Sequence, residues 1–262
     1  MSGITASDKT YDGSTSATLG TGSVSYGGLV SGDNLTGTYS GVFNNANVGT
    51  GKTVTITSSY GGADVNNYTI TDQASTTADI FKKALTAAAS ASNKVYDASS
   101  TATTTLTLSG LVGTETLNVT NTSTFDNKNV GTGKTVTVNS ITLANGSNVG
   151  LATNYSISIG QTTTANVTAK ALSVSGITTS NKTYDSNTTA SLNTGSVTYT
   201  GLISGDVFNG TYTGAFSDKN VGTGKTVTIT PSYTGADVSN YSVLITQQLQ
   251  RTLQQRLYQY RV

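Results

Sequence analysis

Three copies of the stretch N-V-G-T-G-K-T-V-T come closest to a chemical motif in this sequence. They lie at residues 47–55, 129–137 and 220–228. The G-T-G-K-T core resembles the end of a phosphate-binding loop, but that loop needs a further glycine five residues earlier and a helix directly after it. The positions of the required glycine hold Ala46, Lys128 and Lys219. Alternating β-branched residues follow each copy, so the pattern predicts turns that lead into strands, with the lysine as a solvated charge.

A tyrosine and an aspartate stand side by side in three copies of a K-[TV]-Y-D box. The pairs are Tyr11 with Asp12, Tyr96 with Asp97, and Tyr184 with Asp185. A tyrosine ring can stack on a sugar while a carboxylate accepts the sugar's hydroxyl hydrogen bonds, so these are candidate ligand residues. In the competing interpretation, the ring packs at a strand end and the aspartate accepts hydrogen bonds from the following backbone amides. A motif present in every module usually serves the fold, which favours the structural role.

A third box, N-Y-[ST], closes each copy. Its pairs are Asn67 with Tyr68, Asn154 with Tyr155, and Asn240 with Tyr241. They resemble a tyrosine corner near a late strand, which also predicts a structural role. The same residues form N-x-[ST] sequons, which matter only in a glycosylating compartment.

The sequence predicts no cofactor and no enzymatic activity. It contains no cysteine and no histidine, which excludes the usual zinc sites, thiol chemistry and Ser-His or Cys-His pairs. Calcium is the more credible metal, because four aspartates lie near turns rich in glycine and asparagine. They are Asp33, Asp64, Asp206 and Asp237. No D-x-[DN]-x-[DN]-G cluster is present, however, and no two acids are singled out for acid and base roles.

Strands are the elements that must position these residues. Apolar residues make up 35% of the 262 residues and charged residues only 10%, and valine, isoleucine and tyrosine recur throughout. Alternating runs separated by glycine turns predict an all-β fold of small sandwich or sheet modules. The residues expected to face inward, with the intervening threonines outward, are Val54, Ile56, Val136, Val138, Val227 and Ile229.

The boxes recur in the same order about 85 residues apart, which indicates tandem copies of one module. We expect repeat 1 at 1–82, truncated at its N-terminus, repeat 2 at 83–169 and repeat 3 at 170–246. Each is large enough for a modest core of its own. Contacts mainly between sequence neighbours would make the array elongated. Repeat 2 departs from the others, with Glu115 in place of the Gly-Asp turn and Ala98 in place of the box glycine.

Charge and hydropathy argue against nucleic acid and membrane as partners. The formal charges of the three repeats are −3, +1 and 0, and the last sixteen residues carry +3, so no repeat has the basic face of a nucleic-acid-binding domain. No apolar run approaches the length of a membrane span, and residues 1–12 lack the pattern of a signal peptide.

Together, K-x-Y-D-[GAS], G-L-[VI]-S-G-D, N-V-G-T-G-K-T-V-T and the closing N-Y resemble YDG-type repeats of large bacterial surface adhesins of the filamentous haemagglutinin kind. The resemblance covers residues 1–246. It implies export through a partner outer-membrane transporter to the bacterial cell surface, where the repeats lie in the extended part of a longer adhesin. It implies no catalytic residues.

Two functions fit this sequence. The first is a non-enzymatic stalk of tandem β modules that contact their neighbouring repeats and hold an adhesive tip away from the cell. The alternative is an array in which each module binds a host-surface glycan or matrix component weakly and the whole gains avidity.

Residues 247–262 break the repeat pattern and contain all three arginines of the chain. Read one base earlier in suitable codons, residues 249–262 become T-A-N-I-T-A-K-A-L-S-V-S-G, which matches residues 164–176 with one Val-to-Ile change. We therefore infer a frameshift that truncated a longer repeat gene. Leu249, Leu253 and Leu257 are spaced by four, so this non-native tail is expected to be helical or disordered. Repeat 3 should then lack part of its final strand and expose a sheet edge liable to pair with another chain.

Overall fold

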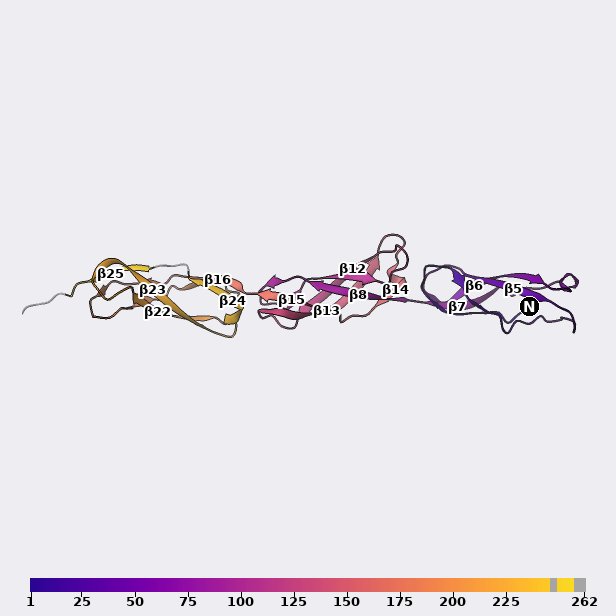
Figure 1. The fold of residues 1–262 in the computed structure, drawn as a ribbon, viewed down its shortest axis with the longest axis horizontal. Helices are drawn as coiled ribbons and strands as arrows, with labels where there is room; N and C mark the ends of the chain where they lie inside the picture. The colour runs from indigo at the N-terminus through magenta and orange to yellow at the C-terminus, as the bar shows by residue number, and fades with distance from the viewer. Residues whose placement is uncertain (246–248, 257–262) are drawn as a thin grey trace, which may run out of the picture. The chain divides into compact units, whose positions relative to one another are not determined.

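The computed structural model describes residues 1–245 and 249–256. The regular structure of these residues is strand, apart from three single-turn 3-10 helices (Figure 1). The expected all-β fold is therefore confirmed. The described helices are too short to cross a membrane.

The chain divides into two compact units whose boundary passes through repeat 2. Unit 1 comprises residues 1–89, 105–122 and 138–161. Unit 2 comprises residues 90–104, 123–137 and the described residues from 162 onward. The junction of repeats 1 and 2 therefore lies inside unit 1, and the junction of repeats 2 and 3 lies inside unit 2.

Unit 1 contains a five-stranded sheet in the order β2-β7-β6-β5-β3. Its strands are β2 (Lys9–Thr10), β3 (Ser16–Ala17), β5 (Thr36–Phe43), β6 (Gly49–Gly61) and β7 (Ser75–Phe81). All neighbours are antiparallel except β2 and β7, which are parallel. A two-stranded ribbon is formed by β1 (Thr5–Ala6) and β4 (Leu19–Gly20).

A three-stranded sheet completes unit 1 in the order β11-β8-β14. Its strands are β8 (Lys83–Ala91), β11 (Thr104–Ser109) and β14 (Tyr155–Ile157), and β14 runs parallel to β8. The helices η1 (Val65–Asn67) and η2 (Ala152–Asn154) each end directly before the tyrosine of an N-Y box. Strand β8 follows β7 after a single residue and so connects repeat 1 to repeat 2.

Unit 2 contains two sheets of five strands. The first, β10-β12-β13-β15-β9, has β9 (Lys94–Val95), β10 (Thr101–Ala102), β12 (Leu117–Phe125), β13 (Gly131–Asn145) and β15 (Thr162–Thr168). Parts of β12 and β13 belong to unit 1. The second, β18-β25-β23-β22-β19, has β18 (Lys182–Thr183), β19 (Thr189–Ala190), β22 (Asn209–Phe216), β23 (Gly222–Thr234) and β25 (Leu249–Gln254).

Smaller elements complete unit 2. The three-stranded sheet β21-β16-β24 has β16 (Lys170–Ser175), β21 (Thr198–Thr200) and β24 (Tyr241–Ile245). The ribbon is formed by β17 (Thr178–Thr179) and β20 (Leu192–Asn193), and η3 (Val238–Asn240) precedes the last N-Y tyrosine. The five-stranded sheet of repeat 3 thus has the same strand order as the five-stranded sheets of repeats 1 and 2.

The alternation of the T-V-T strands places their apolar residues inward, as expected. Val54, Val136 and Val138 are fully buried, Ile56 and Val227 are nearly so, and Ile229 is half-buried against the core. Most of the intervening threonines are exposed; Thr137 and Thr226 are half-buried. The period-two pattern therefore predicts the buried face correctly.

Two of the three buried apolar clusters draw on two consecutive repeats. In unit 1, Phe43 and Ile80 of repeat 1 belong to one cluster with Leu85 and Tyr155 of repeat 2. In unit 2, Phe125 of repeat 2 shares a cluster with Leu172, Phe208 and Tyr241 of repeat 3. The cores of repeats 1 and 2 are therefore shared with the repeat that follows, whose residues cover the end of each sheet.

The lysines of the G-K-T turns are not solvated charges, contrary to expectation. The Lys134 side chain is only 8% exposed and lies 2.8 Å from an Asp126 carboxylate oxygen. Lys52 donates to Asn45 and Lys225 pairs with Asp218. In each sheet the register shifts at the G-T-G residues, so the lysine folds back over the loop before the strand.

The expectation of a missing final strand is wrong for residues 249–254. Strand β25 pairs antiparallel with β23 and parallel with β18, the place that β7 and β15 take in the other sheets. Leu249 and Leu253 are both buried. Residues four apart share one face of a strand as well as of a helix, so their spacing suits either element. Of the rest of the proposed tail, residues 247–248 and 257–262 lie outside the described residues.

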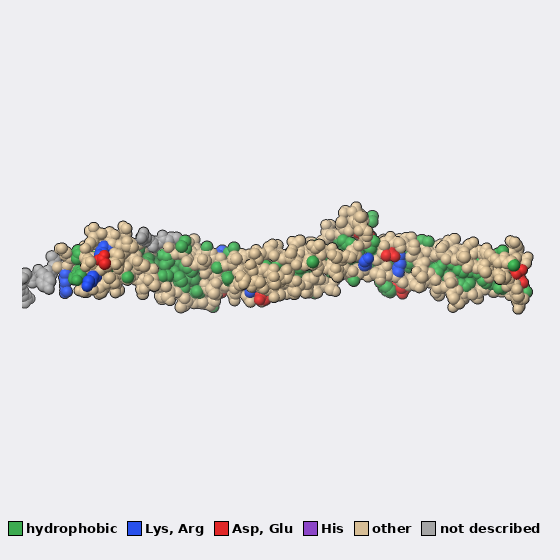
Figure 2. Space-filling model, viewed as in Figure 1, with side chains coloured by type: hydrophobic (Ala, Val, Ile, Leu, Met, Phe, Trp, Pro, Cys, Tyr) green, Lys and Arg blue, Asp and Glu red, His purple; other side chains and the backbone are tan. Residues whose placement is uncertain are grey.

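The surface carries few charges. Figure 2 shows that the face in view consists mainly of uncharged polar side chains and backbone, with lysine, arginine and acidic side chains in small groups.

Candidate functional site

The Y-D and N-Y boxes meet where repeat 1 adjoins repeat 2, a place we call joint 1. The rings of Tyr11 and Tyr155 pack edge to face, with centroids 5.4 Å apart and an interplanar angle of 81°. Both hydroxyls donate to Glu115, at 2.6 Å from Tyr11 Oη to Oε1 and 2.7 Å from Tyr155 Oη to Oε2. Tyr155 Oη also accepts a hydrogen bond from the Val112 amide. Both tyrosines are at most 5% exposed, so joint 1 is closed.

The asparagine of the N-Y box completes joint 1. Asn154 is 1% exposed, and its Oδ1 accepts from the Val48 amide at 3.0 Å while its Nδ2 donates to Asn47 Oδ1 at 3.0 Å. Asn47 and Val48 begin the N-V-G-T-G-K-T box of repeat 1. Helix η2 and strand β14 position Asn154 and the next residue, Tyr155. Residues of three boxes are thus held in one contact, together with the turn that carries Glu115.

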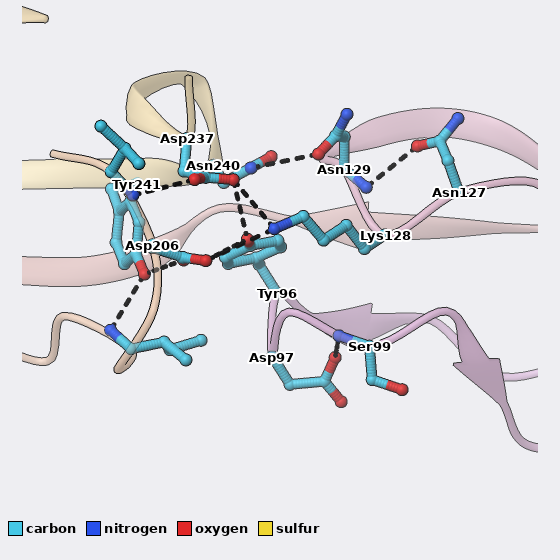
Figure 3. A network of polar contacts seen from close by, with 12 residues as sticks. Tyr96, Asp97, Ser99, Asn127, Lys128, Asn129, Asp206, Asp237, Asn240 and Tyr241 are labelled. Atoms are coloured by element: carbon cyan, nitrogen blue, oxygen red, sulfur yellow. Dashed lines mark hydrogen bonds and ion pairs between the residues drawn. The ribbon is translucent and has the colours of Figure 1, made fainter. Parts of the chain in front are cut away.

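Joint 2, between repeats 2 and 3, has the same arrangement (Figure 3). Tyr96 and Tyr241 pack edge to face at 5.6 Å and 78°, and Asp206 accepts from both hydroxyls. Asn240 is fully buried; its Oδ1 accepts from the Val130 amide at 2.9 Å, and its Nδ2 donates to Asn129. Asp206 thus replaces Glu115 as the carboxylate that binds both tyrosines.

A lysine distinguishes joint 2 from joint 1. Lys128 Nζ lies 3.0 Å from Asp237 and 3.4 Å from Asp206, and 5.9 Å from the centre of the Tyr96 ring. The Asp206 side chain is 3% exposed and that of Asp237 is 10% exposed, so the cation neutralises two nearly buried carboxylates. The corresponding residues of joint 1 are uncharged. Ala46 replaces the lysine, and Leu151 occupies the position before η2 that Asp237 occupies before η3.

The electrostatics of both joints keep the tyrosines neutral. Burial, followed by the hydrogen bond to Glu115, raises the pKa values of Tyr11 and Tyr155 to about 12. Burial and the bond to Asp206 raise the pKa of Tyr241 to about 12 as well. The hydrogen bond from the Val207 amide and that from Lys128 lower the pKa of Asp237. At neutral pH, the tyrosines therefore act as hydrogen-bond donors to fixed carboxylates.

The lysine and the aspartate of the K-x-Y-D box hold the loop around it. Lys9 Nζ lies 2.8 Å from Asp12, and the same carboxylate accepts from the Ser14 amide at 2.8 Å. The residue after the aspartate has a positive φ in all three repeats: Gly13, Ala98 and Ser186. A Cβ on Gly13 would lie 2.9 Å from a Val112 methyl group across joint 1. The box therefore points its tyrosine into the joint and its aspartate toward solvent.

The family model of the YDG domain matches residues 1–78, 81–165 and 168–249. The chain belongs to the YDG domain family. No curated protein and no solved structure matches it. The repeated YDG boxes are thus the residues with which one repeat contacts the next.

The candidate ligand pairs are divided between two environments. Tyr11 and Tyr96 are buried in joints, whereas the side chains of Asp12 and Asp97 are 53% and 55% exposed and accept from the amides of Ser14 and Ser99. These YDG tyrosines are therefore closed to a sugar. In the third YDG repeat, Tyr184 is half-buried, and Asp185 is exposed and pairs with Lys182.

The four aspartates considered for calcium have other partners in these YDG repeats. Asp33 accepts from Tyr68, Asp64 accepts from the Asn34 amide, and the remaining two pair with Lys128. Among residues 1–245 and 249–256, no group of three or more acidic side chains is placed to hold a metal ion.

Sequence reasoning missed the partners of the YDG tyrosines. From the sequence alone, Glu115 is only a departure from the Gly-Asp turn, and Lys128 is only a departure from a phosphate-binding loop. One signal was available: an acid recurs once per repeat after the G-L box, as Asp33, Glu115 and Asp206. A second signal was a matched difference between consecutive repeats. Lys128 of repeat 2 is followed by Asp237 in repeat 3, whereas Ala46 of repeat 1 is followed by Leu151 in repeat 2.

Proposed function

We propose that this chain is a non-enzymatic structural segment of a secreted bacterial surface adhesin, and that its repeats hold a binding region away from the cell. The observation that carries the proposal is the use of the YDG motifs. At joints 1 and 2, the tyrosines and asparagines that recur in every repeat are buried against the next repeat. A motif that joins modules suits a spacer.

The same geometry supports a non-enzymatic role. Glu115 and Asp206 each accept hydrogen bonds from two tyrosines, and Lys128 pairs with carboxylates. These charged groups are engaged in fixed contacts and are not directed at an open cleft. Export through an outer-membrane transporter and a place at the bacterial surface belong to the proposal through the resemblance to haemagglutinin-like adhesins.

A binding screen separates the stalk from the rival array. The purified chain is applied to a glycan array, to immobilised matrix proteins and to host cells. A stalk gives no saturable binding, and small-angle scattering gives a maximum dimension that decreases when a repeat is deleted.

Tyr184 provides the sharpest variant, because it is the YDG tyrosine that is not buried in a joint. Saturable binding that is lost in Tyr184→Ala, with an unchanged circular dichroism spectrum, would replace the stalk with the binding array. Asp72→Asn is a matched control, since this exposed residue lies outside both joints.

A further inference from the structure

Repeat 1 and repeat 3 each carry one half of a joint that is not filled by another described repeat. The socket face of repeat 1 consists of Val30, Asp33, Asp64, Asn67 and Tyr68, which correspond to joint 2 residues Ile203, Asp206, Asp237, Asn240 and Tyr241. The plug face of repeat 3 consists of Tyr184, Lys219, Asn220 and Val221, which correspond to Tyr96, Lys128, Asn129 and Val130. Each face is thus the counterpart of a surface that is buried at joint 2.

The socket face already has the internal geometry of a joint. Tyr68 Oη donates to Asp33 at 2.6 Å and accepts from the Val30 amide at 3.0 Å, as Tyr241 does with Asp206 and Ile203 in joint 2. Asn67, however, is exposed, and Val30 is 61% exposed. The socket is therefore formed in advance, with Val30 and Asn67 open to solvent.

The plug face contains a depression that could receive the tyrosine of a socket face. An open depression of about 650 Å³ is lined by Tyr184 and Val221, together with Asp185, Ser186, Asn220, Gln255 and Arg256. At joint 1, Tyr155 packs on the corresponding Tyr11, and Asn154 bonds the corresponding Val48 amide. Val221 is 46% exposed here, whereas Val48 and Val130 are half-buried against their clusters.

The charges of the two open faces match each other. Lys219 is exposed on the plug, and Asp33 and Asp64 lie on the socket. This is the combination of joint 2, where Lys128 pairs with Asp206 and Asp237, and not that of joint 1, where Ala46 and Leu151 are uncharged. Opposite charges placed on complementary surfaces favour the correct partner and disfavour others.

We propose that the plug face of repeat 3 binds the socket face of repeat 1 in a second copy of this chain, forming a joint of the same kind as joint 2. Tyr184 packs edge to face on Tyr68, and Lys219 lies between Asp33 and Asp64. Asn67 bonds the Val221 amide. The contact is heterologous, because the plug face of one copy meets the socket face of another, and such contacts extend head to tail.

Sedimentation velocity of the full chain over a series of concentrations tests this proposal. Because a few side chains form the contact, we expect reversible association at concentrations on the order of 100 µM and above, weakened by added salt. Lys219→Glu and Asn67→Ala should each weaken it by about ten-fold or more. Lys82→Glu, with the same change of charge at an exposed residue outside both faces, should leave it unchanged.

A charge exchange distinguishes the proposed contact from other self-association. Lys219→Glu and Asp64→Lys chains should each remain monomeric alone, and an equimolar mixture should associate again, because each variant retains one native face. Circular dichroism checks that both variants are folded, and Asn67→Ala tests the socket without a change of charge. A monomeric wild-type chain at the highest concentration would overturn the proposal. Association that is unaffected by these substitutions, or not restored by mixing, would also do so.

Discussion

Joints 1 and 2 build the same contact from different charges. In both, two edge-to-face tyrosines donate to one carboxylate, and a buried asparagine bonds the amide of a valine in the preceding repeat. Joint 1 uses Glu115 beside uncharged Ala46 and Leu151, whereas joint 2 uses Asp206 beside the pair of Lys128 and Asp237.

This difference indicates that some residues of a joint set its geometry and others select the partner repeat. The tyrosines and asparagines are common to both joints, so they set the geometry by which one repeat follows another. The lysine and its aspartate occur together or not at all at the two joints, so they distinguish one pair of repeats from another. A lysine facing Leu151 would lose the second of its two carboxylate partners, which makes the wrong order unfavourable.

Loss of a joint tyrosine should have the largest effect. We expect Tyr96→Ala and Tyr11→Ala each to lower the free energy of unfolding by about 3–5 kcal/mol, because each removes a buried ring and leaves a carboxylate short of one donor. Urea unfolding followed by circular dichroism measures this. Tyr184→Ala, at the half-buried counterpart, is the control and should cost less than about 1 kcal/mol. Equal losses at all three positions would show that the tyrosines stabilise single repeats and not joints.

Removal of the lysine should affect joint 2 alone. Lys128→Met should lower the free energy of unfolding, because it leaves Asp206 and Asp237 without their cation; the loss should be smaller than for a fully buried pair, since the Lys128 side chain is 40% exposed. Lys219→Met, at the exposed counterpart in repeat 3, should change stability by less than about 0.5 kcal/mol. Unfolding in urea at low salt measures both effects. An unchanged free energy of unfolding in Lys128→Met would mean that Asp206 and Asp237 need no cation.

Transplanting the charges should make joint 1 resemble joint 2. Leu151→Asp alone should be destabilising, because it places a carboxylate at a half-buried apolar position where the corresponding residue of repeat 1, Ala46, supplies no cation. Adding Ala46→Lys should recover about 1 kcal/mol, which a double-mutant cycle measures as a favourable coupling. Purely additive effects would contradict a role for the lysine and aspartate as a pair.

The smallest expected difference lies in the pH dependence. Both joints contain tyrosines whose pKa is raised from 10.0 to about 12, so their contribution is complete below pH 10 and is lost as the pH rises through about 12. Joint 2 also contains Asp237, whose pKa is lowered from 3.8, so its contribution is present above about pH 4 and is lost as the pH falls.

Amide hydrogen exchange of Val48 and Val130 reports on the two joints separately. Acidification from about pH 5 to about pH 3 should reduce the protection of the Val130 amide from exchange more than that of the Val48 amide, after correction for intrinsic rates. Lys128→Met should reduce this difference. Equal protection of both amides across that range would contradict the distinction between the joints.

Much of the fold could be predicted from local pattern. The alternation around Val54 and Val136 determines which face of β6 and β13 is buried, because successive side chains of a strand point to opposite sides. Recurrence of the boxes indicates tandem repeats, and the glycine-rich turns predict where strands begin. The leucines of β25 show the limit of such patterns, since a spacing of four suits a strand as well as a helix.

The partners of the repeated residues depend on long-range contacts of the folded chain. Tyr11 and Glu115 are 104 positions apart and Tyr96 and Asp206 are 110 apart, so no local periodicity relates them. The order of the residues alone shows that a tyrosine, an asparagine and an acid recur in each repeat. Their meeting depends on the direction in which strands β7 and β15 continue into the next repeat, because that continuation brings the N-Y helix of one repeat onto the open sheet end of the repeat before it.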